Sequence, residues 1–191
     1  AHPYGAHRLI GERVSVAKGK WAQGITPRNF CWIVKDRLAI CERPGGYGDN
    51  HRRVRRQEEI IWLREQGFDP VISLIEANHN LHNYEELGVR SLHYPFPALE
   101  SDQPEYLASL YGTMQDLLGE QRKVMVHCSE LSDRLAGVIG GYLVWSGMVD
   151  SPPGGISVME RITSRQLGPQ GRGLVALADR LPVEGPHDAA D

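Results

Sequence analysis

The segment Val124-Met-Val-His-Cys-Ser-Glu-Leu-Ser-Asp-Arg134 lies between two strongly apolar stretches of the chain. Residues 123–127 have the apolar character of a buried strand, and residues 135–146 are apolar on nearly every side, which predicts a buried helix. A short loop between such a strand and helix can point its backbone N–H groups into one concavity, and the helix N-terminus adds partial positive charge. The segment therefore predicts an anion-binding loop.

Two side chains of this loop have the chemistry needed to transfer a phosphoryl group. Arg134 provides a planar fork of N–H donors suited to phosphate oxygens. Cys128 lies at the start of the same loop, close to the loop N–H groups and the helix N-terminus. We expect these dipoles to lower the pKa of its thiol and favour a thiolate. A thiolate beside a bound phosphate can attack phosphorus in line, and His127 can order the loop through hydrogen bonds. A cysteine and an arginine at this spacing form a weak pattern alone; the strand, the histidine and the buried helix strengthen it.

The rest of the chain alternates short apolar runs with amphipathic segments, which is typical of α/β domains. Strands are predicted at 30–34, 38–40, 70–75, 90–94 and 123–127, and helices at 49–66, 82–87, 102–118, 135–146, 156–165 and 171–181. We therefore expect a single α/β domain whose mostly parallel central sheet is flanked by helices. Ligands of such sheets bind at the carboxyl ends of the strands, which is where Cys128 falls.

Composition restricts the classes of function. The 191 residues are 41% hydrophobic and 24% charged, with a formal net charge of -3, so no basic field indicates nucleic acid as a partner. No apolar run has the ~20 residues that a membrane span needs. The three cysteines, Cys31, Cys41 and Cys128, are too few for a disulfide framework and favour a reducing, cytoplasmic location. Their spacing does not suit zinc, so neither metal nor cofactor is expected, and Cys31 and Cys41 are interpreted as small buried residues.

In the segment from Val124 to Arg134, the chain resembles the small dual-specificity and atypical members of the protein tyrosine phosphatase superfamily. Their signature is His-Cys, five residues and Arg, which here is His127 to Arg134. Three further stretches resemble the same domains: Asn29-Phe-Cys-Trp-Ile-Val-Lys-Asp-Arg-Leu-Ala39, Trp62-Leu-Arg-Glu-Gln-Gly67 with Val71-Ile-Ser-Leu74, and Tyr84-Glu-Glu-Leu-Gly-Val-Arg-Ser-Leu-His-Tyr-Pro-Phe-Pro97. The resemblance implies a phosphatase-like domain at 29–181, preceded by an arm at 1–28 and followed by a disordered tail at 182–191.

The resemblance also implies roles for the residues of the loop. Cys128 would attack phosphorus and Arg134 would hold the oxygens of the phosphate, without a metal. The remaining loop residues would line the phosphate site: His127, Ser129, Glu130, Leu131 and Ser132. The substrate would be a phosphorylated protein, a phosphorylated small molecule or a lipid headgroup; the sequence does not indicate an oligomeric state.

The sequence departs from the family pattern at three positions. Leu131 stands where these loops usually carry Gly, and Leu135 stands where Ser or Thr usually follows the Arg. Ala98 occupies the nearest equivalent of the usual general-acid Asp. Asp133, directly before Arg134, resembles the Asp thought to be the acid in myotubularins and in bacterial lipid-active members. We therefore expect Asp133 to act as the general acid, with Asp102 and Glu100 as the competing carboxyls; Asp102 could instead cap a helix.

Three classes of function remain open at this point. The leading one is hydrolysis of phosphate monoesters through a cysteinyl-phosphate intermediate. The second is a phosphate-binding pseudophosphatase with weak or no turnover, which Leu131, Leu135 and Ala98 favour. The third, sulfur transfer on a rhodanese-like fold, is disfavoured by the resemblance at residues 84–97.

The basic cluster His51-Arg-Arg-Val-Arg-Arg56 is interpreted as a solvated helix face paired with Glu58 and Glu59, or as a platform for an acidic substrate.

Overall fold

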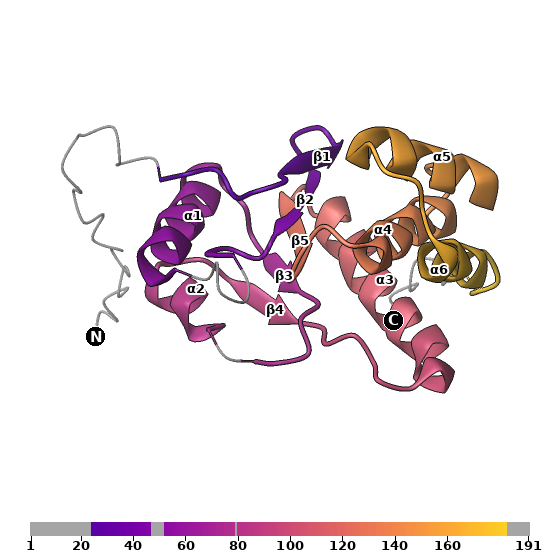
Figure 1. The fold of residues 1–191 in the computed structure, drawn as a ribbon, viewed down its shortest axis with the longest axis horizontal. Coiled ribbons are helices and arrows are strands. Elements are labelled where there is room, and N and C mark those ends of the chain that lie inside the picture. Colours follow the sequence, from indigo (N-terminus) through magenta and orange to yellow (C-terminus); the bar gives the residue numbers. More distant parts are fainter. Residues whose placement is uncertain (1–23, 47–51, 79, 183–191) are drawn as a thin grey trace, which may run out of the picture.

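The computed structural model describes residues 24–46, 52–78 and 80–182, in which strands and helices alternate along the chain (Figure 1). The strands are β1 (Cys31–Val34), β2 (Leu38–Glu42), β3 (Val71–Ser73), β4 (Ser91–His93) and β5 (Val124–Cys128). The helices are α1 (Arg53–Glu65), α2 (His82–Glu86), α3 (Gln103–Gly119), α4 (Asp133–Trp145), α5 (Pro152–Thr163) and α6 (Pro169–Asp179). A single 3-10 turn, η2 (Glu100–Asp102), leads into α3.

The strands form one sheet in the order β1-β2-β5-β3-β4. Only the β1–β2 pair is antiparallel; β2, β5, β3 and β4 run parallel, which confirms the predicted α/β domain with a mostly parallel sheet. In this register Glu42 lies opposite Cys128, and Ser73 lies opposite His127. The carboxyl ends of three neighbouring strands therefore meet at one edge of the sheet.

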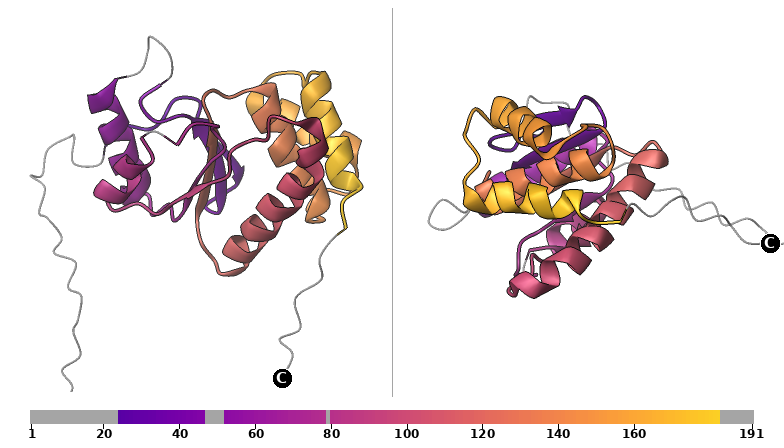
Figure 2. Two further views of the ribbon diagram at one scale, coloured as in Figure 1. Left: turned by 90° about the horizontal axis from the view of Figure 1, so that it is seen from below. Right: turned by 90° about the vertical axis from the view of Figure 1, so that its right-hand side faces the viewer.

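Helices cover both faces of the sheet (Figures 1 and 2). α1 and α2 lie on one face, and α3, α4, α5 and α6 lie on the other. The alternating residues of β2 show how one strand serves both layers: Leu38 and Ile40 join the core under α3–α6, whereas Ala39 and Cys41 join the core under α1. Each of these four side chains is fully buried, as the period of two along a strand requires.

Glycines set the distance between α4 and the last two helices. A Cβ atom on Gly137 would lie 2.5 Å from the Cα atom of Gly171 on α6. A Cβ atom on Gly155 of α5 would lie 3.0 Å from the carbonyl oxygen of Gly140. Because larger residues at these positions would push the helices apart, the small side chains allow α6 to begin directly beside the first turn of α4.

The last two helices begin earlier than predicted. The sequence indicated starts at residues 156 and 171, but α5 begins at Pro152 and α6 at Pro169. Proline is tolerated in the first helical turn because the N–H that it lacks has no helical partner there. Ser151 also accepts a hydrogen bond from Gly154 N at 3.3 Å, which caps α5. The glycines and prolines between these observed starts and the predicted ones are therefore helical.

The ends of the predicted domain make contacts with its body. Ile25 N donates to the carbonyl of Glu58 on α1 at 3.1 Å, so the described part of the predicted arm lies against that helix. Trp145 Nε1 donates to the carbonyl of Pro182 at 3.2 Å. Residues 1–23 and 183–191, which hold most of the predicted arm and tail, lie outside the described residues, as does His51 of the basic cluster.

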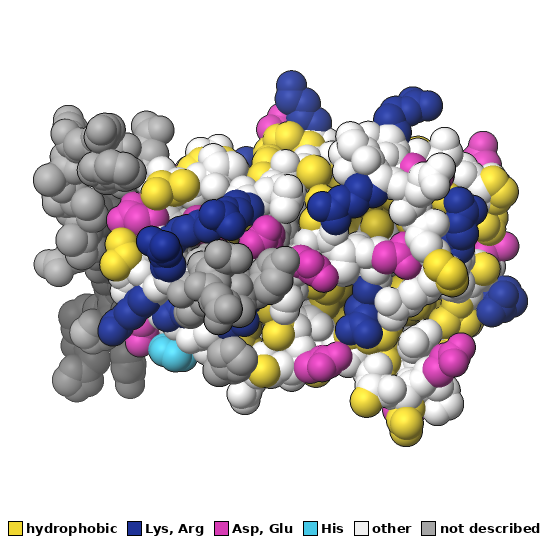
Figure 3. All heavy atoms as spheres, in the orientation of Figure 1, with side chains coloured by type: hydrophobic (Ala, Val, Ile, Leu, Met, Phe, Trp, Pro, Cys, Tyr) yellow, Lys and Arg dark blue, Asp and Glu magenta, His cyan; other side chains and the backbone are white. Residues whose placement is uncertain are grey.

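Figure 3 shows how charged side chains are distributed over one face of the molecule. On the face shown in Figure 3, acidic and basic side chains are interspersed. In the part of the chain that the structure describes, no helix is both long and apolar enough to cross a membrane.

Candidate active site

A cavity of about 560 Å³ opens at the carboxyl edge of the sheet, where β2, β5 and β3 end. Four segments that are distant in sequence form it: the turn after β2, the segment after β3, the loop from β5 into α4, and the start of α6. Its lining residues are Arg43, Leu74, Ile75, Glu76, Ala77, Cys128, Ser129, Glu130, Ser132, Arg134 and Gln170. The structure therefore brings Cys128, Ser129, Glu130, Ser132 and Arg134 together around one cavity.

Cys128 is the last residue of β5, and only 8% of its surface is exposed. Burial raises the pKa of its thiol to about 12; Arg134 and a hydrogen bond with the Ser132 side chain lower it, whereas Glu130 and Glu76 raise it. The predicted depression of this pKa is therefore wrong. The reason is that burial and two neighbouring carboxylates outweigh the favourable field of Arg134.

Arg134 lies in the first turn of α4, and its guanidinium stacks on the ring of Phe96 with 4.2 Å between Cζ and the ring centroid. Its Nη1 donates to Glu76 Oε1 at 3.3 Å, but the Glu76 side chain is 69% exposed. Arg134 Nε is buried and has no hydrogen-bond partner among the described residues. The guanidinium is thus held in place and keeps donor capacity that an anion in the cavity could use.

The loop from Ser129 to Ser132 is fixed by contacts with the helices around it. Ser132 Oγ accepts a hydrogen bond from Leu135 N at 3.2 Å and caps α4. Arg165, after α5, donates to the carbonyl of Leu131 at 2.9 Å. Leu131, which stands where glycine was expected, turns its side chain into the core and is 6% exposed. Leu131 therefore contributes to the packing beneath the loop and does not line the cavity.

His127 lies behind the cavity and is almost completely buried. Burial lowers its pKa to about 4, so the ring is neutral near pH 7. Its Nδ1 lies 3.1 Å from the carbonyl oxygen of Cys128, which can only accept, so Nδ1 carries the proton. Nε2 then accepts from the Tyr84 hydroxyl at 3.0 Å. These two bonds connect β5 to α2 and hold the backbone of Cys128, as expected from the sequence.

Asp133 faces away from this cavity. Its Oδ1 accepts a hydrogen bond from Gly168 N at 2.7 Å, and its Oδ2 accepts one from Gly171 N at 2.8 Å. The carboxylate therefore satisfies two backbone N–H groups at the start of α6, which favours an anion at that position. A Cβ atom on Gly171 would lie 2.3 Å from Oδ1, so glycine is needed for this contact. This geometry argues against the predicted general-acid role of Asp133.

The other two candidate acids lie on the exposed segment before α3. Glu100 lines a second cavity of about 520 Å³, which adjoins the first through Gln170. Asp102 occupies the N-cap position of α3 but its side chain makes no capping hydrogen bond. Ala98 is exposed. Neither carboxyl lines the cavity that contains Cys128.

Arg43 and Glu76 belong to the cavity but were not singled out in the sequence. Arg43 follows β2, and Glu76 lies just beyond β3. The signal was available, because Glu76 comes directly after the predicted strand at 70–75 and Arg43 comes three residues after the predicted strand at 38–40, and parallel strands end at the same edge. The residue Gln170, near the start of α6, also lines the cavity, whereas Gln166 lines a separate hollow with Asp133.

Among the described residues, no group of three His, Cys, Asp or Glu is placed to hold a metal ion.

No protein-family model matches the sequence, and none of the curated proteins matches it. Solved structures do match. Tk-PTP in its active form is 22% identical, with a TM-score of 0.63 over 80% of this chain and 97% of that chain. Kinase associated phosphatase, with its catalytic-site cysteine replaced by serine, is 17% identical, with a TM-score of 0.67 over 82% and 97%. The core catalytic domain of the PP-IP phosphatase SIW14 from S. cerevisiae is 14% identical, with a TM-score of 0.57 over 80% and 86%. The chain therefore has the fold of the protein tyrosine and dual-specificity phosphatases.

Proposed function

We propose that this protein hydrolyses phosphate monoesters through a covalent cysteinyl-phosphate intermediate. The observation that carries the proposal is the shared cavity of Cys128 and Arg134 at the carboxyl edge of the sheet, with Ser129 and Ser132 beside them. Arg134 lines this cavity, and its buried Nε has no hydrogen-bond partner among the described residues. The phosphatase fold supports the same reaction.

In the proposed reaction, Cys128 Sγ attacks phosphorus and the bond to the leaving oxygen breaks. The proton that the thiol loses balances the proton that the leaving oxygen gains. Water then attacks phosphorus, which releases inorganic phosphate and restores the thiol. Arg134 stabilises the charge on the phosphate oxygens in both steps. A phosphorylated protein, a phosphorylated small molecule and a lipid headgroup remain the candidate substrates.

The proposal assigns no general acid from the three carboxyls suggested by the sequence. The Asp133 carboxylate accepts two hydrogen bonds from backbone N–H groups at the start of α6. Asp102 and Glu100 do not line the cavity. A reaction without a positioned acid depends strongly on the leaving group, because an acid contributes about 10²–10⁴-fold when the leaving group is poor. We therefore expect nitrophenyl phosphate to be cleaved much faster than an alkyl phosphate.

The second candidate function is a phosphate-binding module without turnover. The specific observation in its favour is the pKa of Cys128, which burial raises to about 12, so that little thiolate is present near pH 7. Leu131 and Leu135 also replace the residue types that the resemblance leads us to expect.

One experiment separates these functions. The wild type and Cys128→Ser are assayed for hydrolysis of nitrophenyl phosphate, and both are titrated with inorganic phosphate by calorimetry. The phosphatase proposal expects turnover by the wild type alone and phosphate binding by both proteins. Phosphate binding without wild-type turnover on nitrophenyl, peptide or inositol phosphates would establish the binding module. Equal turnover by the two proteins would rule out Cys128 as the nucleophile.

A further inference from the structure

A second cavity, of about 520 Å³, adjoins the candidate active site and shares Gln170 with it. One wall is the start of α3 with the turn before it, and the other wall belongs to α6. These two helices contact each other on the same face of the sheet (Figure 2). The lining residues of this α3–α6 groove are Glu100, Gln103, Pro104, Pro169, Gln170, Gly173, Leu174, Ala176, Leu177 and Arg180. A substrate whose phosphate lies at Cys128 can therefore extend into the groove.

The α6 wall of the groove contains a stripe along one side of the helix. Its residues follow one another at intervals of three or four: Gln170, Leu174, Leu177 and Arg180. Because a helix rises about 1.5 Å per residue, the stripe extends about 15 Å from Gln170 to Arg180. An extended peptide advances about 3.3 Å per residue, so about five residues cover this distance. The groove therefore has the length of a short peptide segment.

The uncharged part of the lining suits a peptide. Leu174 is buried, and Ala176 and Leu177 are half-buried, so this part of the surface is apolar. The amide side chains of Gln103 and Gln170 also line the groove. A side-chain amide both donates and accepts hydrogen bonds, which matches the N–H and C=O groups of an extended backbone. The groove can therefore receive apolar side chains and satisfy polar main-chain groups.

Two charged side chains of opposite sign line the groove, Glu100 and Arg180. Both residues are exposed, and neither side chain makes a hydrogen bond or an ion pair with another described residue. An anionic membrane surface is attracted by clusters of basic residues, but Arg180 is the only basic residue among those described that line the groove. Arg180 lies ten residues beyond Gln170, where it is available to a single acidic side chain.

Building on the proposed hydrolysis at Cys128, we propose that the α3–α6 groove binds the chain that flanks the phosphorylated residue of a protein substrate. Arg180 selects an acidic side chain about five residues from that residue. Gly173 keeps the groove open: it lines the groove, and a Cβ atom there would meet nothing within 4 Å outside the backbone of its own helix. A leucine at this position would fill the groove and would also raise helix propensity, so the fold should be kept.

Binding measurements test the groove without requiring turnover. Cys128→Ser protein is titrated by calorimetry with phenyl phosphate and with two tyrosine-phosphorylated peptides, whose flanks are alanine and serine. One peptide also carries glutamate about five residues away on both sides. We expect Gly173→Leu to weaken binding of the glutamate peptide by about 10-fold and binding of phenyl phosphate by less than about 2-fold, because only the flanks reach the groove.

The matched control for the filled groove is Gly112→Leu on α3. A Cβ atom on Gly112 would also meet nothing within 4 Å outside its own helix, but Gly112 does not line the groove. This variant should leave all three affinities unchanged. Circular dichroism shows whether both leucine variants keep the helical content of the parent protein.

A charge reversal tests the role of Arg180 separately. We expect Arg180→Glu to weaken the glutamate peptide by about 10-fold, to change the alanine–serine peptide by less than about 2-fold, and to strengthen a matching lysine peptide by about 3-fold. A merely structural role of Arg180 would not reverse the preference. Arg161→Glu is the matched control, because Arg161 is an exposed arginine in the last turn of α5. It should leave the order of the three peptides unchanged.

The outcomes separate the groove from the reaction. Selective loss of peptide affinity in Gly173→Leu would support the groove even if the wild type did not hydrolyse nitrophenyl phosphate, a result that would overturn the hydrolysis alone. Equal losses for peptide and phenyl phosphate, or no loss, would overturn the groove and leave the hydrolysis intact. Binding of none of these ligands would overturn both.

Two further outcomes concern the occupant of the groove. If Gly173→Leu weakens the peptide but Arg180→Glu does not, the selection of an acidic flank is overturned. The same variants are also mixed with phosphatidylcholine vesicles that contain or lack phosphatidylinositol phosphate. Binding to the phosphorylated vesicles that Gly173→Leu abolishes, without an effect on the peptides, would overturn the peptide as the occupant and assign the groove to lipid.

Discussion

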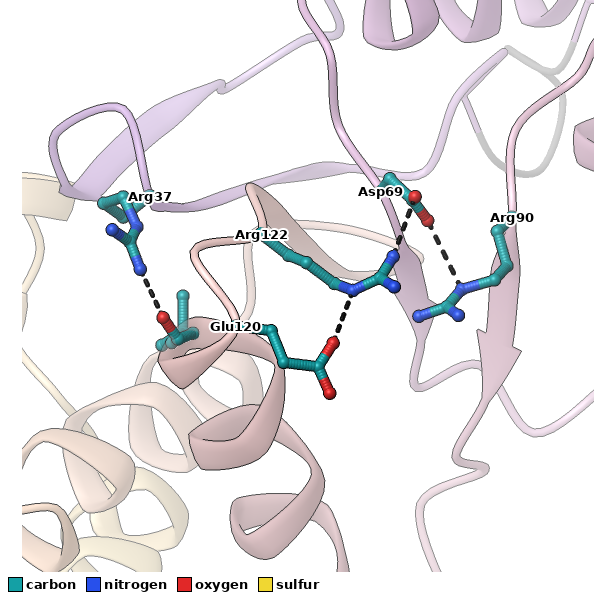
Figure 4. Close-up of polar contacts among 6 residues, drawn as sticks. Arg37, Asp69, Arg90, Glu120 and Arg122 are labelled. Atoms are coloured by element: carbon teal, nitrogen blue, oxygen red, sulfur yellow. Dashed lines mark hydrogen bonds and ion pairs between the residues drawn. The ribbon is translucent and has the colours of Figure 1, made fainter.

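The two ends of the parallel sheet use charged residues in different ways. At the amino end, a chain of ion pairs joins Arg90, Asp69, Arg122 and Glu120 (Figure 4). Arg122 Nη1 lies 2.9 Å from Asp69 Oδ2, Arg122 Nε lies 2.7 Å from Glu120 Oε2, and Arg90 Nε lies 3.3 Å from Asp69 Oδ1. Asp69 is 52% exposed, so each pair stabilises the fold only weakly.

At the carboxyl end, the two arginines that line the cavity are paired less completely. Arg43 has no ion pair within the described residues, and Arg134 has one long contact with the exposed Glu76. The hydrogen-bonding capacity of these arginines is directed into a cavity rather than consumed by neighbours. Net charge, which is -3 for the whole chain, therefore does not locate an anion site. The balance of partners around each arginine does.

The largest expected effect comes from the arginine that this comparison places at the reacting phosphate. Arg134→Lys keeps the positive charge but loses the planar fork, so we expect kcat/KM on nitrophenyl phosphate to fall by about 100-fold or more. Arg122→Lys, at the amino end, is the matched control and should leave kcat/KM unchanged. An Arg134→Lys enzyme with nearly normal kcat/KM would show that the two ends of the sheet do not differ in the proposed way.

A smaller effect is expected from the carboxylate that holds α6. Asp133→Ala removes the acceptor of both the Gly168 and Gly171 N–H groups, so we expect the free energy of unfolding in urea to fall by about 1–3 kcal/mol. Asp102→Ala, at an N-cap position without a capping bond, should change it by less than about 0.5 kcal/mol.

The same Asp133 variant also tests the acid assignment made from the sequence. If Asp133 has only the structural role, its replacement changes hydrolysis of nitrophenyl phosphate and of an alkyl phosphate in equal proportion. A loss confined to the alkyl phosphate would restore Asp133 as the general acid.

The sequence was informative where one periodic segment determines the structure. The apolar runs at residues 123–127 and 135–146 correspond to β5 and α4. The sequence alone therefore placed Cys128 at the end of a parallel strand. The fold class is confirmed for the same reason. The strands at 70–75 and 90–94 are shorter than predicted, because pairing with neighbours, rather than apolar character, sets where a strand ends.

The sequence was less informative where the answer depends on distant segments. The partners of Asp133 lie 35 and 38 residues further along the chain, and no local pattern connects them. The pKa of Cys128 depends on its burial and on Glu76, which lies in the segment after β3 rather than in the loop. Cys31 was expected to be buried like Cys41, but it is only partly buried because β1 is the edge strand. These properties arise from packing across the sheet.

The smallest expected effect concerns Glu76, which acts on both groups at the reacting phosphate. Its carboxylate pairs with Arg134 and raises the pKa of Cys128, so Glu76→Gln should free the guanidinium and lower the pKa of the thiol. Both changes favour attack. We expect kcat/KM on nitrophenyl phosphate at pH 7 to rise by about 3-fold, a modest gain because Glu76 is mostly exposed and screened.

The pH profile shows whether the thiol is responsible for this gain. The attacking form is the thiolate, and burial raises the pKa of Cys128 to about 12, so kcat/KM should increase with pH from neutral into the alkaline range. In Glu76→Gln the same rise should begin at lower pH, because one carboxylate that opposes the thiolate is gone. Glu100→Gln, whose carboxyl lines only the neighbouring cavity, should keep the wild-type profile. A slower Glu76→Gln enzyme, or one with an unmoved profile, would mean that Glu76 positions Arg134 for catalysis instead of competing with the substrate for it.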